Sequence, residues 1–263
     1  MKTDMMKFDK EHDLLIVPDV HGRTFWRQPV MGGNYAHVVF LGDYTDPYPH
    51  EGIDRDSSVE MFREIVTFAE EHEGKVTLLL GNHDMHYISE TFDDMARGSR
   101  YSMWSRRPVS TIYKAHSHLF SLAFEADYDG KHCLLTHAGV TSEWLHSHEQ
   151  LVEAPTAANI NALMGSEEGI AALADVGWAR GGWASTGGPM WADYTEVAAS
   201  EPLPGILQIF GHTQTMRREP IVRPHLACVD CHRIFMLSEL VALSRRWDRP
   251  TSEPDETGLA DVE

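Results

Sequence analysis

Six short apolar runs are the feature of this sequence that most constrains its fold. Each has four or five residues, and in chain order they are LLIVP (14–18), HVVFL (37–41), VTLLL (76–80), HCLLT (132–136), ILQIF (206–210) and IFML (234–237). Short runs of this kind, with little polar alternation, are typical of strands buried on both faces of a sheet. The sequence therefore predicts a layered fold built on short internal strands.

A helix is predicted between the second and third runs, in residues 56–74. Apolar residues recur at helical spacing, Ser57 and Glu60 have the spacing of a capping box, and Gly74 closes the segment. The order strand, helix, strand is typical of a βαβ unit, so the predicted fold class is α/β (α+β). Asp129-Gly130, between two further strand-like stretches, predicts a hairpin.

The chain of 263 residues is long enough for one large domain with a sizeable core. We expect a single domain over residues 1–245, with a cap-like insertion at about 141–204 that covers the edge of the sheet. This stretch is rich in Ala, Gly and Trp and has only weak helical patterns. Residues 246–263 are acidic and poor in apolar side chains, which predicts a disordered tail.

The charge of the chain limits its partners. The formal net charge is −18, from 22 basic and 40 acidic residues, which disfavours nucleic acid and anionic membrane surfaces. No apolar run approaches the ~18 residues that span a bilayer, and the N-terminal stretch MKTDMMKFDKEHD has no apolar signal segment. These features predict a cytoplasmic protein that binds neither nucleic acid nor membrane.

The motif CVDCH at residues 228–232 matches the C-x-x-C-H pattern of c-type haem attachment. Haem attachment in its usual setting needs export, and we find no export signal. A zinc site is little favoured, because no second C-x-x-C accompanies the motif. The three cysteines, Cys133, Cys228 and Cys231, are too few for a disulfide scaffold. We interpret them as structural.

Metal-type ligands follow five of the six apolar runs, nearly always beside glycine. In chain order these stretches are Asp19-Val20-His21-Gly22, Gly42-Asp43-Tyr44-Thr45-Asp46, Gly81-Asn82-His83-Asp84, His137-Ala138-Gly139 and Gly211-His212-Thr213. One polar turn after a strand is ordinary, but five at the same relative position indicate a single site at the strand ends. Glycines there allow tight turns and close approach of the backbone.

The residue types indicate which metals the site suits. Aspartate, histidine and asparagine favour Mn²⁺, Fe or Zn²⁺ over copper or an iron–sulfur cluster. Six or so ligands are too many for one structural zinc, whereas two metals roughly 3.5–4 Å apart, bridged by a carboxylate and a hydroxide, use them all. We predict two divalent metal ions, with Mn²⁺ as the first choice and Fe or Zn²⁺ as alternatives.

In this order, Asp-x-His, Gly-Asp-x-x-Asp, Gly-Asn-His-Asp, His-Ala-Gly and Gly-His resemble the motifs of the calcineurin-like metallophosphoesterases. The similarity is greatest to the phosphoprotein-phosphatase-like branch, which includes bacterial dinucleoside tetraphosphatases, and it spans roughly residues 13–240. The resemblance implies two packed mixed β-sheets flanked by helices, with the dimetal site at the sheet edge.

The resemblance also implies a role for each ligand. Asp19, His21 and Asp43 would hold the first metal, and Asp43 would bridge to the second. The ligands that complete the second metal would be Asn82, His137 and His212. His83 and Asp46 match the catalytic pair of the family.

The function implied is hydrolysis of a phosphorylated substrate by a metal-bound hydroxide, with His83 protonating the leaving oxygen. Phosphomonoesters, in a phosphoprotein carrying phosphoserine or phosphothreonine or in a small molecule, are the first choice. Dinucleoside polyphosphates or other phosphoanhydrides are the alternative. A non-catalytic scaffold with the same fold is disfavoured, because a scaffold would be expected to lose His83 or Asp43, and both are present.

The sequence departs from the family at the positions that bind phosphate. Protein phosphatases of the family usually have arginine after the second aspartate of Gly-Asp-x-x-Asp, where this chain has Pro47, and a second arginine near a segment that resembles GPMWADY, where it has Asp193. We therefore assign no substrate-binding residue from the motifs. The arginines that could substitute are Arg23, Arg180 and Arg217.

Overall fold

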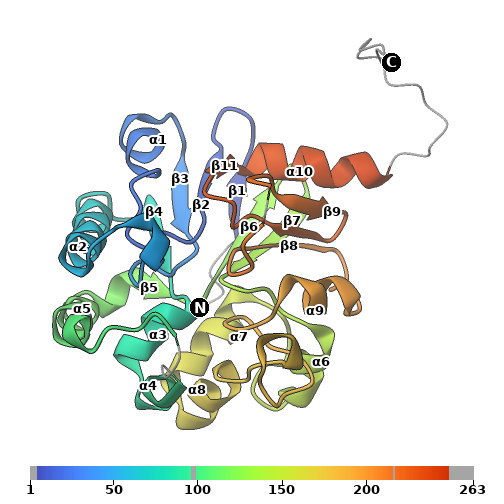
Figure 1. Ribbon diagram of the computed structural model, residues 1–263. Helices are drawn as coiled ribbons and strands as arrows, with labels where there is room; N and C mark the ends of the chain where they lie inside the picture. The colour runs from blue at the N-terminus through green and yellow to red at the C-terminus, as the bar shows by residue number, and fades with distance from the viewer. Residues whose placement is uncertain (1–4, 96–98, 216, 249–263) are drawn as a thin grey trace, which may run out of the picture.

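The computed structural model of the protein describes residues 5–95, 99–215 and 217–248. Two mixed β-sheets pack together, and helices flank them (Figure 1). The strands are β1 (Met6–Phe8), β2 (Leu14–Val17), β3 (His37–Phe40), β4 (Val76–Leu79), β5 (Phe120–Ser121), β6 (Ala123–Tyr128), β7 (Lys131–Thr136), β8 (Ile206–Phe210), β9 (Ile221–Arg223), β10 (Leu226–Cys228) and β11 (Phe235–Met236). This architecture confirms the predicted fold class.

The α-helices are α1 (Arg27–Gly32), α2 (Arg55–Glu71), α3 (Asn82–Ile88), α4 (Glu90–Met95), α5 (Met103–Ala115), α6 (Ser142–Ser147), α7 (Ala157–Ala162), α8 (Glu167–Leu173), α9 (Tyr194–Ala199) and α10 (Leu237–Arg245). Short 3-10 helices are η1 (Pro49–Glu51), η2 (Ser117–Leu119), η3 (Leu163–Gly165), η4 (Trp178–Arg180) and η5 (Arg246–Asp248).

The strand order brings the carboxyl ends of the central strands together. One sheet has the order β11-β2-β3-β4-β5, in which β2 to β5 are parallel. The other has the order β1-β6-β7-β8-β10-β9, in which β7, β8 and β10 are parallel. Parallel neighbours end at the same edge of a sheet, so each sheet gathers the polar stretches that follow its strands at one edge.

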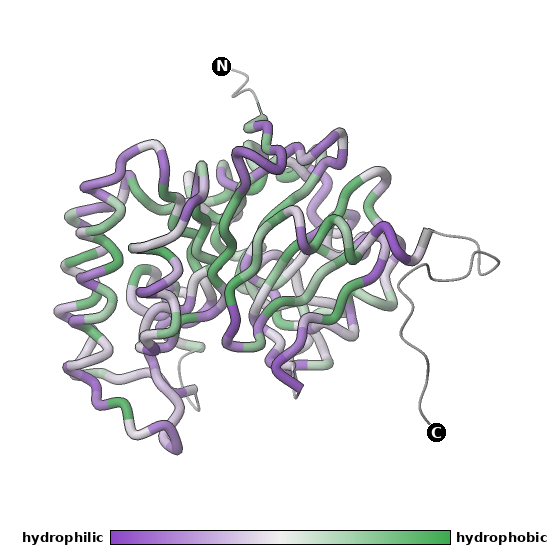
Figure 2. The backbone as a smooth tube through the Cα atoms, turned by 90° about the horizontal axis from the view of Figure 1, so that it is seen from above, coloured by the Kyte–Doolittle hydropathy of each residue, from purple (hydrophilic) through white to green (hydrophobic). Residues whose placement is uncertain are grey.

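Two apolar layers hold the sheets in place. Between the sheets, Ile16 and Val39 of one sheet join Leu135 of the other in a buried cluster. On its opposite face the five-stranded sheet contributes Val17 and Phe40 to a cluster that includes the apolar sides of α2 and α5. Side chains alternate along a strand, so neighbouring residues of β2 and β3 enter different layers. In Figure 2 long hydrophobic stretches of the backbone run through the middle of the molecule.

The structure confirms five of the predicted strands as β2, β3, β4, β7 and β8, and the predicted hairpin joins β6 to β7. Two details of the sequence analysis were wrong. Asp54, not Ser57, caps α2, because the Asp54 carboxylate accepts the Ser57 N–H at 2.9 Å and Ser57 lies inside the helix. In the run 234–237 the strand ends at Met236, because Leu237 begins α10, whose apolar side packs against the sheets.

The stretch 141–204 is helical and contains α6 to α9 (Figure 1). It contributes Trp144, Ile160 and Leu173 to the buried cluster that also contains α2. Its role as a cap within a single domain of residues 1–245 stays a prediction. In the predicted tail, 246–248 form η5 and 249–263 lie outside the described residues. Of the helices in the described ranges, none has both the length and the apolar character needed to cross a membrane.

The three cysteines are buried free thiols. Burial raises the pKa of Cys133 to about 12 and that of Cys231 to about 11, so both thiols stay protonated near neutral pH. The Cys228 sulfur lies 3.2 Å from the carbonyl oxygen of Thr213. These surroundings agree with a structural role.

Gly42 provides a test of how closely the ends of β3 and β4 approach. Its φ is +104°, and a Cβ there would lie 2.4 Å from the backbone nitrogen of Gly81. Gly74 also has a positive φ, +80°, but nothing lies within 4 Å of its added Cβ. Both changes to alanine carry the strain of a positive φ, about 1–2 kcal/mol. Overpacking against Gly81 should cost about 2 kcal/mol more, and only in Gly42→Ala. Urea unfolding of both variants would measure the difference in the free energy of unfolding. Equal losses would contradict the close approach.

Candidate metal centre

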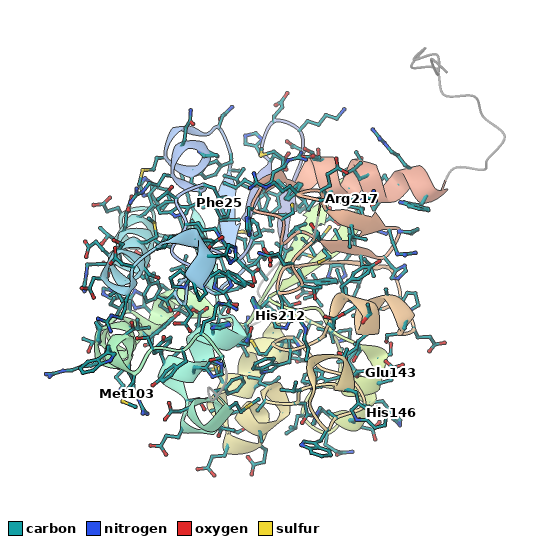
Figure 3. All side chains as sticks on the ribbon, in the orientation of Figure 1. Phe25, Met103, Glu143, His146, His212 and Arg217 are labelled. Atoms are coloured by element: carbon teal, nitrogen blue, oxygen red, sulfur yellow. The ribbon has the colours of Figure 1, made fainter. Side chains whose placement is uncertain are left out.

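The structure brings all the predicted metal ligands to one place, where the edges of the two sheets meet. His212, labelled in Figure 3, lies near the middle of the molecule, and the other predicted ligands follow β2, β3, β4 and β7. Hydrogen bonds join the sheets here. The backbone N–H of His212 donates to Asp19 Oδ1 at 3.0 Å, and His137 Nδ1 lies 2.9 Å from the carbonyl oxygen of Leu41.

Asp43 belongs to two groups of potential ligands. One group is Asp19, His21 and Asp43, the other is Asp43, His137 and His212, and within each group the ligand atoms lie within 4.8 Å of one another. The two oxygens of Asp43 face different groups. Oδ2 is 3.5 Å from His21 Nε2, and Oδ1 is 3.6 Å from His137 Nε2. This arrangement suits a carboxylate that bridges two metals.

The histidine tautomers direct lone pairs into the site. Nδ1 of His21 lies 2.8 Å from the carbonyl oxygen of Thr45, and Nδ1 of His137 has the same kind of partner in Leu41. A carbonyl oxygen only accepts, so Nδ1 carries a proton in both rings, and Nε2 is the nitrogen that faces the site. His137 Nε2 lies 3.0 Å from Asn82 Oδ1. A ring nitrogen and an amide oxygen that face the same point fit a shared cation.

Burial makes the negative charge of the site energetically unfavourable unless cations compensate it. Five carboxylates are at most 3% exposed: Asp19, Asp43, Asp46, Asp84 and Asp230. Burial, together with the charge of Asp19, holds the pKa of Asp43 well above its usual value, and burial raises the pKa of Asp84 to about 6. Burial lowers the pKa of His21 and His212, which favours the neutral rings that metals bind. The donor set therefore fits divalent cations, which would compensate the buried charge.

Four site residues have left-handed backbones. The φ angles of His21, Asp43, Asp46 and His212 are +47°, +53°, +59° and +61°. Such angles are uncommon outside glycine and cluster at functional sites, although Asp and His tolerate them better than most residues. The turns after β2, β3 and β8 thus orient ligands through backbone conformations that favour function over local stability.

Asp84 holds the turns that carry Asp43 and Asn82. Its carboxylate accepts the N–H groups of Asp43 at 2.7 Å, Gly81 at 2.8 Å and Tyr44 at 3.1 Å. Asp84 stands in the motif Gly81-Asn82-His83-Asp84, which assigns it no role. Its position three residues after Gly81, at the start of a helix, is the spacing of a capping residue and could have identified it.

His83 and Asp46, the predicted catalytic pair, are hydrogen-bonded beside the ligands. His83 Nδ1 lies 2.8 Å from Asp46 Oδ2, and the His83 ring contacts His21 edge-on with centroids 5.3 Å apart. Because a carboxylate accepts, Nδ1 donates and Nε2 is left for a substrate. The hydroxyl of Tyr87 donates to the other oxygen of Asp46. Sequence reasoning missed Tyr87, although it lies four residues after His83 on the same side of α3.

The arginines proposed from the sequence have different surroundings. Arg23 is buried and paired with Glu51, with Nε 2.8 Å from a carboxylate oxygen. Arg180 is paired with Asp193 at 2.9 Å, close to the turn that carries His212. Arg217 is exposed and stands well apart from His212 in Figure 3.

Two further side chains near the site were missed. Arg100 Nη2 lies 3.1 Å from His21 Nε2, and no motif pointed to it. Asp230, in the CVDCH motif, is buried, and burial followed by the charge of Asp19 holds its pKa well above the usual value. The cysteines are the conspicuous residues of that motif. Asp230 could have been identified from its position just after β10, because the other site residues also follow strands.

The chain matches the family model of the calcineurin-like phosphoesterases over residues 14–216. This match covers more than half of the chain and includes every predicted metal ligand. The protein therefore belongs to this family, and it is a phosphoric ester hydrolase. The family binds divalent metals, in agreement with the two ligand groups.

A solved structure shares the fold. A structure described as a cold-active protein tyrosine phosphatase aligns with a TM-score of 0.53 and 18% identity, over 89% of this chain and 76% of that chain. A protein serine/threonine phosphatase from Saccharomyces cerevisiae, described as similar to human phosphatase PP5, aligns with a TM-score of 0.34 and 17% identity, over 53% of this chain and 43% of that chain. The first similarity supports the fold alone. A comparison with curated proteins found no match.

Replacing Asp43 tests whether both ligand groups depend on one carboxylate. Asp43→Asn removes the shared charge, keeps the side-chain shape and tolerates the left-handed backbone. Loss of a single supporting contact at a metal site lowers metal affinity by about 10–100-fold. We expect Asp43→Asn to lower the metal affinity by at least as much, and the activity should fall with it. Metal analysis and turnover of the purified variant would measure both.

Asp129→Asn is the matched control, because Asp129 is exposed, lies between β6 and β7 and has a similar φ of +51°. It should retain wild-type metal content. Wild-type metal content and turnover in Asp43→Asn would exclude a bridging role for this carboxylate.

Proposed function

We propose that the protein is a phosphatase that uses two divalent metal ions, with Mn²⁺ as the first choice, to hydrolyse phosphomonoesters of a phosphoprotein or a small molecule. The observation that carries the proposal is the position of Asp43, whose oxygens face two ligand groups next to the His83–Asp46 pair. The ligands proposed for the metals are those of the sequence analysis, with His83 and Asp46 as the catalytic pair.

When bound, the two ions would polarise phosphoryl oxygens and lower the pKa of a coordinated water. Residues of the chain would donate the proton to the leaving group and orient the proton donor. His83 presents Nε2 to the substrate and would donate a proton to the leaving oxygen. Asp46 accepts from Nδ1, which orients the imidazole and stabilises its protonated form. The mechanism uses neither a serine nor a cysteine nucleophile.

The proposed partner is therefore a phosphorylated substrate, and the sequence disfavours nucleic acid and membranes. A net charge of −18 does not prevent phosphate binding, because remote surface charges are screened over about 8 Å at physiological salt. Two bound cations would dominate the local potential. We propose a cytoplasmic location on the sequence grounds given above.

Metal analysis followed by a substrate panel tests this function. The purified protein should contain about two divalent ions per chain and should hydrolyse phosphopeptides or small phosphomonoesters faster than dinucleoside tetraphosphate or a phosphodiester. A preference for dinucleoside tetraphosphate would favour the alternative, a phosphoanhydride hydrolase. Loss of all activity on chelation and its return with Mn²⁺ would support metal dependence. Activity that survives complete metal removal would contradict the proposal.

His83→Ala separates proton donation from metal binding. We expect the variant to keep its metals and to lose about 10²–10⁴-fold in turnover on an alkyl phosphate, whose leaving alkoxide needs the proton. The loss on p-nitrophenyl phosphate should be much smaller, because p-nitrophenolate is a good leaving group. Asp46→Asn should show the same bias more weakly, since it acts only through the imidazole. Steady-state kinetics with both substrates at one metal concentration would measure the ratio.

His118→Ala is the control for this experiment, because His118 is an exposed histidine on η2. It should behave as the wild type on both substrates. Equal losses on the two substrates, or loss of metal from His83→Ala, would instead make His83 a structural residue or a ligand.

A further inference from the structure

Arg100 lies against the candidate metal centre, and motif reasoning did not identify it. Its Nε donates to the backbone carbonyl of Asp46 at 3.0 Å, and its Nη2 lies 3.1 Å from Nε2 of His21. The guanidinium lies over the ring of Tyr48 at 3.7 Å from the centroid. Within the described residues, these hydrogen bonds use two of the five N–H donors of the side chain, which leaves the others for a ligand.

The segment that carries Arg100 is anchored two residues further on. The N–H of Ser102 donates to the hydroxyl of Tyr87 at 3.1 Å, and the same hydroxyl donates to Asp46. The Tyr87 and Tyr101 rings pack with centroids 4.9 Å apart. Asp46 therefore positions His83 through its carboxylate and Arg100 through its carbonyl, which places a proton donor and a cation on the same side of the site.

The contact between Arg100 and His21 cannot persist when a metal binds. Nδ1 of His21 donates to Thr45, so Nε2 has a single lone pair, and Arg100 now uses it. A metal ligated by His21 would take that lone pair and would repel the guanidinium. The stacking on Tyr48 and the bond to Asp46 would still hold Arg100 beside the metals. A ligand that lies between the metals and the Arg100 guanidinium would have to compensate the positive charge of both. Such a ligand is an anion.

The other two nearby arginines already have carboxylate partners. Arg23 is paired with Glu51 and Arg180 with Asp193. Within the described part of the chain, Arg100 forms no ion pair with a carboxylate. Its guanidinium is therefore not engaged by a carboxylate as those of Arg23 and Arg180 are.

We propose that Arg100, supported by Tyr48 and Asp46, is the residue that binds the phosphoryl oxygens of the substrate. With metals held by His21 and its neighbours, Arg100 would no longer contact His21 and would be free to do so. The assignment rests on the proposed phosphatase function and adds the substrate contact that the motifs leave open.

Binding of inorganic phosphate to the Mn²⁺-loaded protein tests this assignment without turnover. Arg100→Gln should keep its metal content, and its Mn²⁺ affinity without phosphate should equal or exceed that of the wild type. Its affinity for phosphate, measured by calorimetry, should fall by about 10- to 100-fold, the usual effect of losing hydrogen bonds to a charged group. The matched control is Arg106→Gln, because Arg106 is half-exposed on α5 and paired with Asp93. It should bind phosphate as the wild type does.

Tyr48→Leu is the second variant, and it removes the ring under the guanidinium. It should weaken phosphate binding in the same direction but less, and it decides the question if Arg100→Gln does not fold, as judged by circular dichroism. Wild-type phosphate affinity in the variants would overturn the assignment. Loss of metal from Arg100→Gln would overturn it as well, because Arg100 would then support the metal site. Failure of the proposed function would look different, since the wild type itself would bind neither metal nor phosphate.

Discussion

Buried negative charge is the constraint on which the rest of this structure depends. Five aspartates lie almost wholly buried around one point, and of the described lysines and arginines only Arg23 is buried. Unpaired carboxylates in such a place are costly, and the raised pKa of Asp43 and of Asp230 reflects that cost. Divalent cations resolve the conflict, since two of them could share the carboxylate of Asp43. The fold, the burial and the family therefore all point to a metal centre.

Glycine makes this concentration of charge sterically feasible. A Cβ at Gly81 would lie 2.1 Å from Asp43 Oδ1, and a Cβ at Gly211 would lie 2.1 Å from Asp19 Oδ1. The second contact crosses from one sheet to the other. The glycines beside the ligands thus do more than form turns, because they let the backbone of one strand end approach the carboxylate of another. Two sheets can then contribute ligands to one site.

Asp46 connects the catalytic and substrate-binding parts of the proposed site. Its side chain accepts from His83 and Tyr87, and its carbonyl accepts from Arg100. A left-handed backbone, with φ of +59°, directs these groups to different neighbours. The carboxylate of Asp46 therefore serves the proton donor, whereas its main-chain carbonyl, which does not depend on the side chain, holds Arg100.

The sequence by itself determined the short buried strands and the ligands at their ends, because both depend on local pattern. Runs such as HVVFL are typical of a buried strand, and a parallel sheet brings the residues after its strands together. Only the tertiary structure decided what depends on the path of the chain. Arg100 reaches His21 across 79 positions of sequence, and the run HLACVDCHRIFML divides between β10 of one sheet and β11 of the other. No local periodicity encodes such contacts, because packing of distant segments sets them.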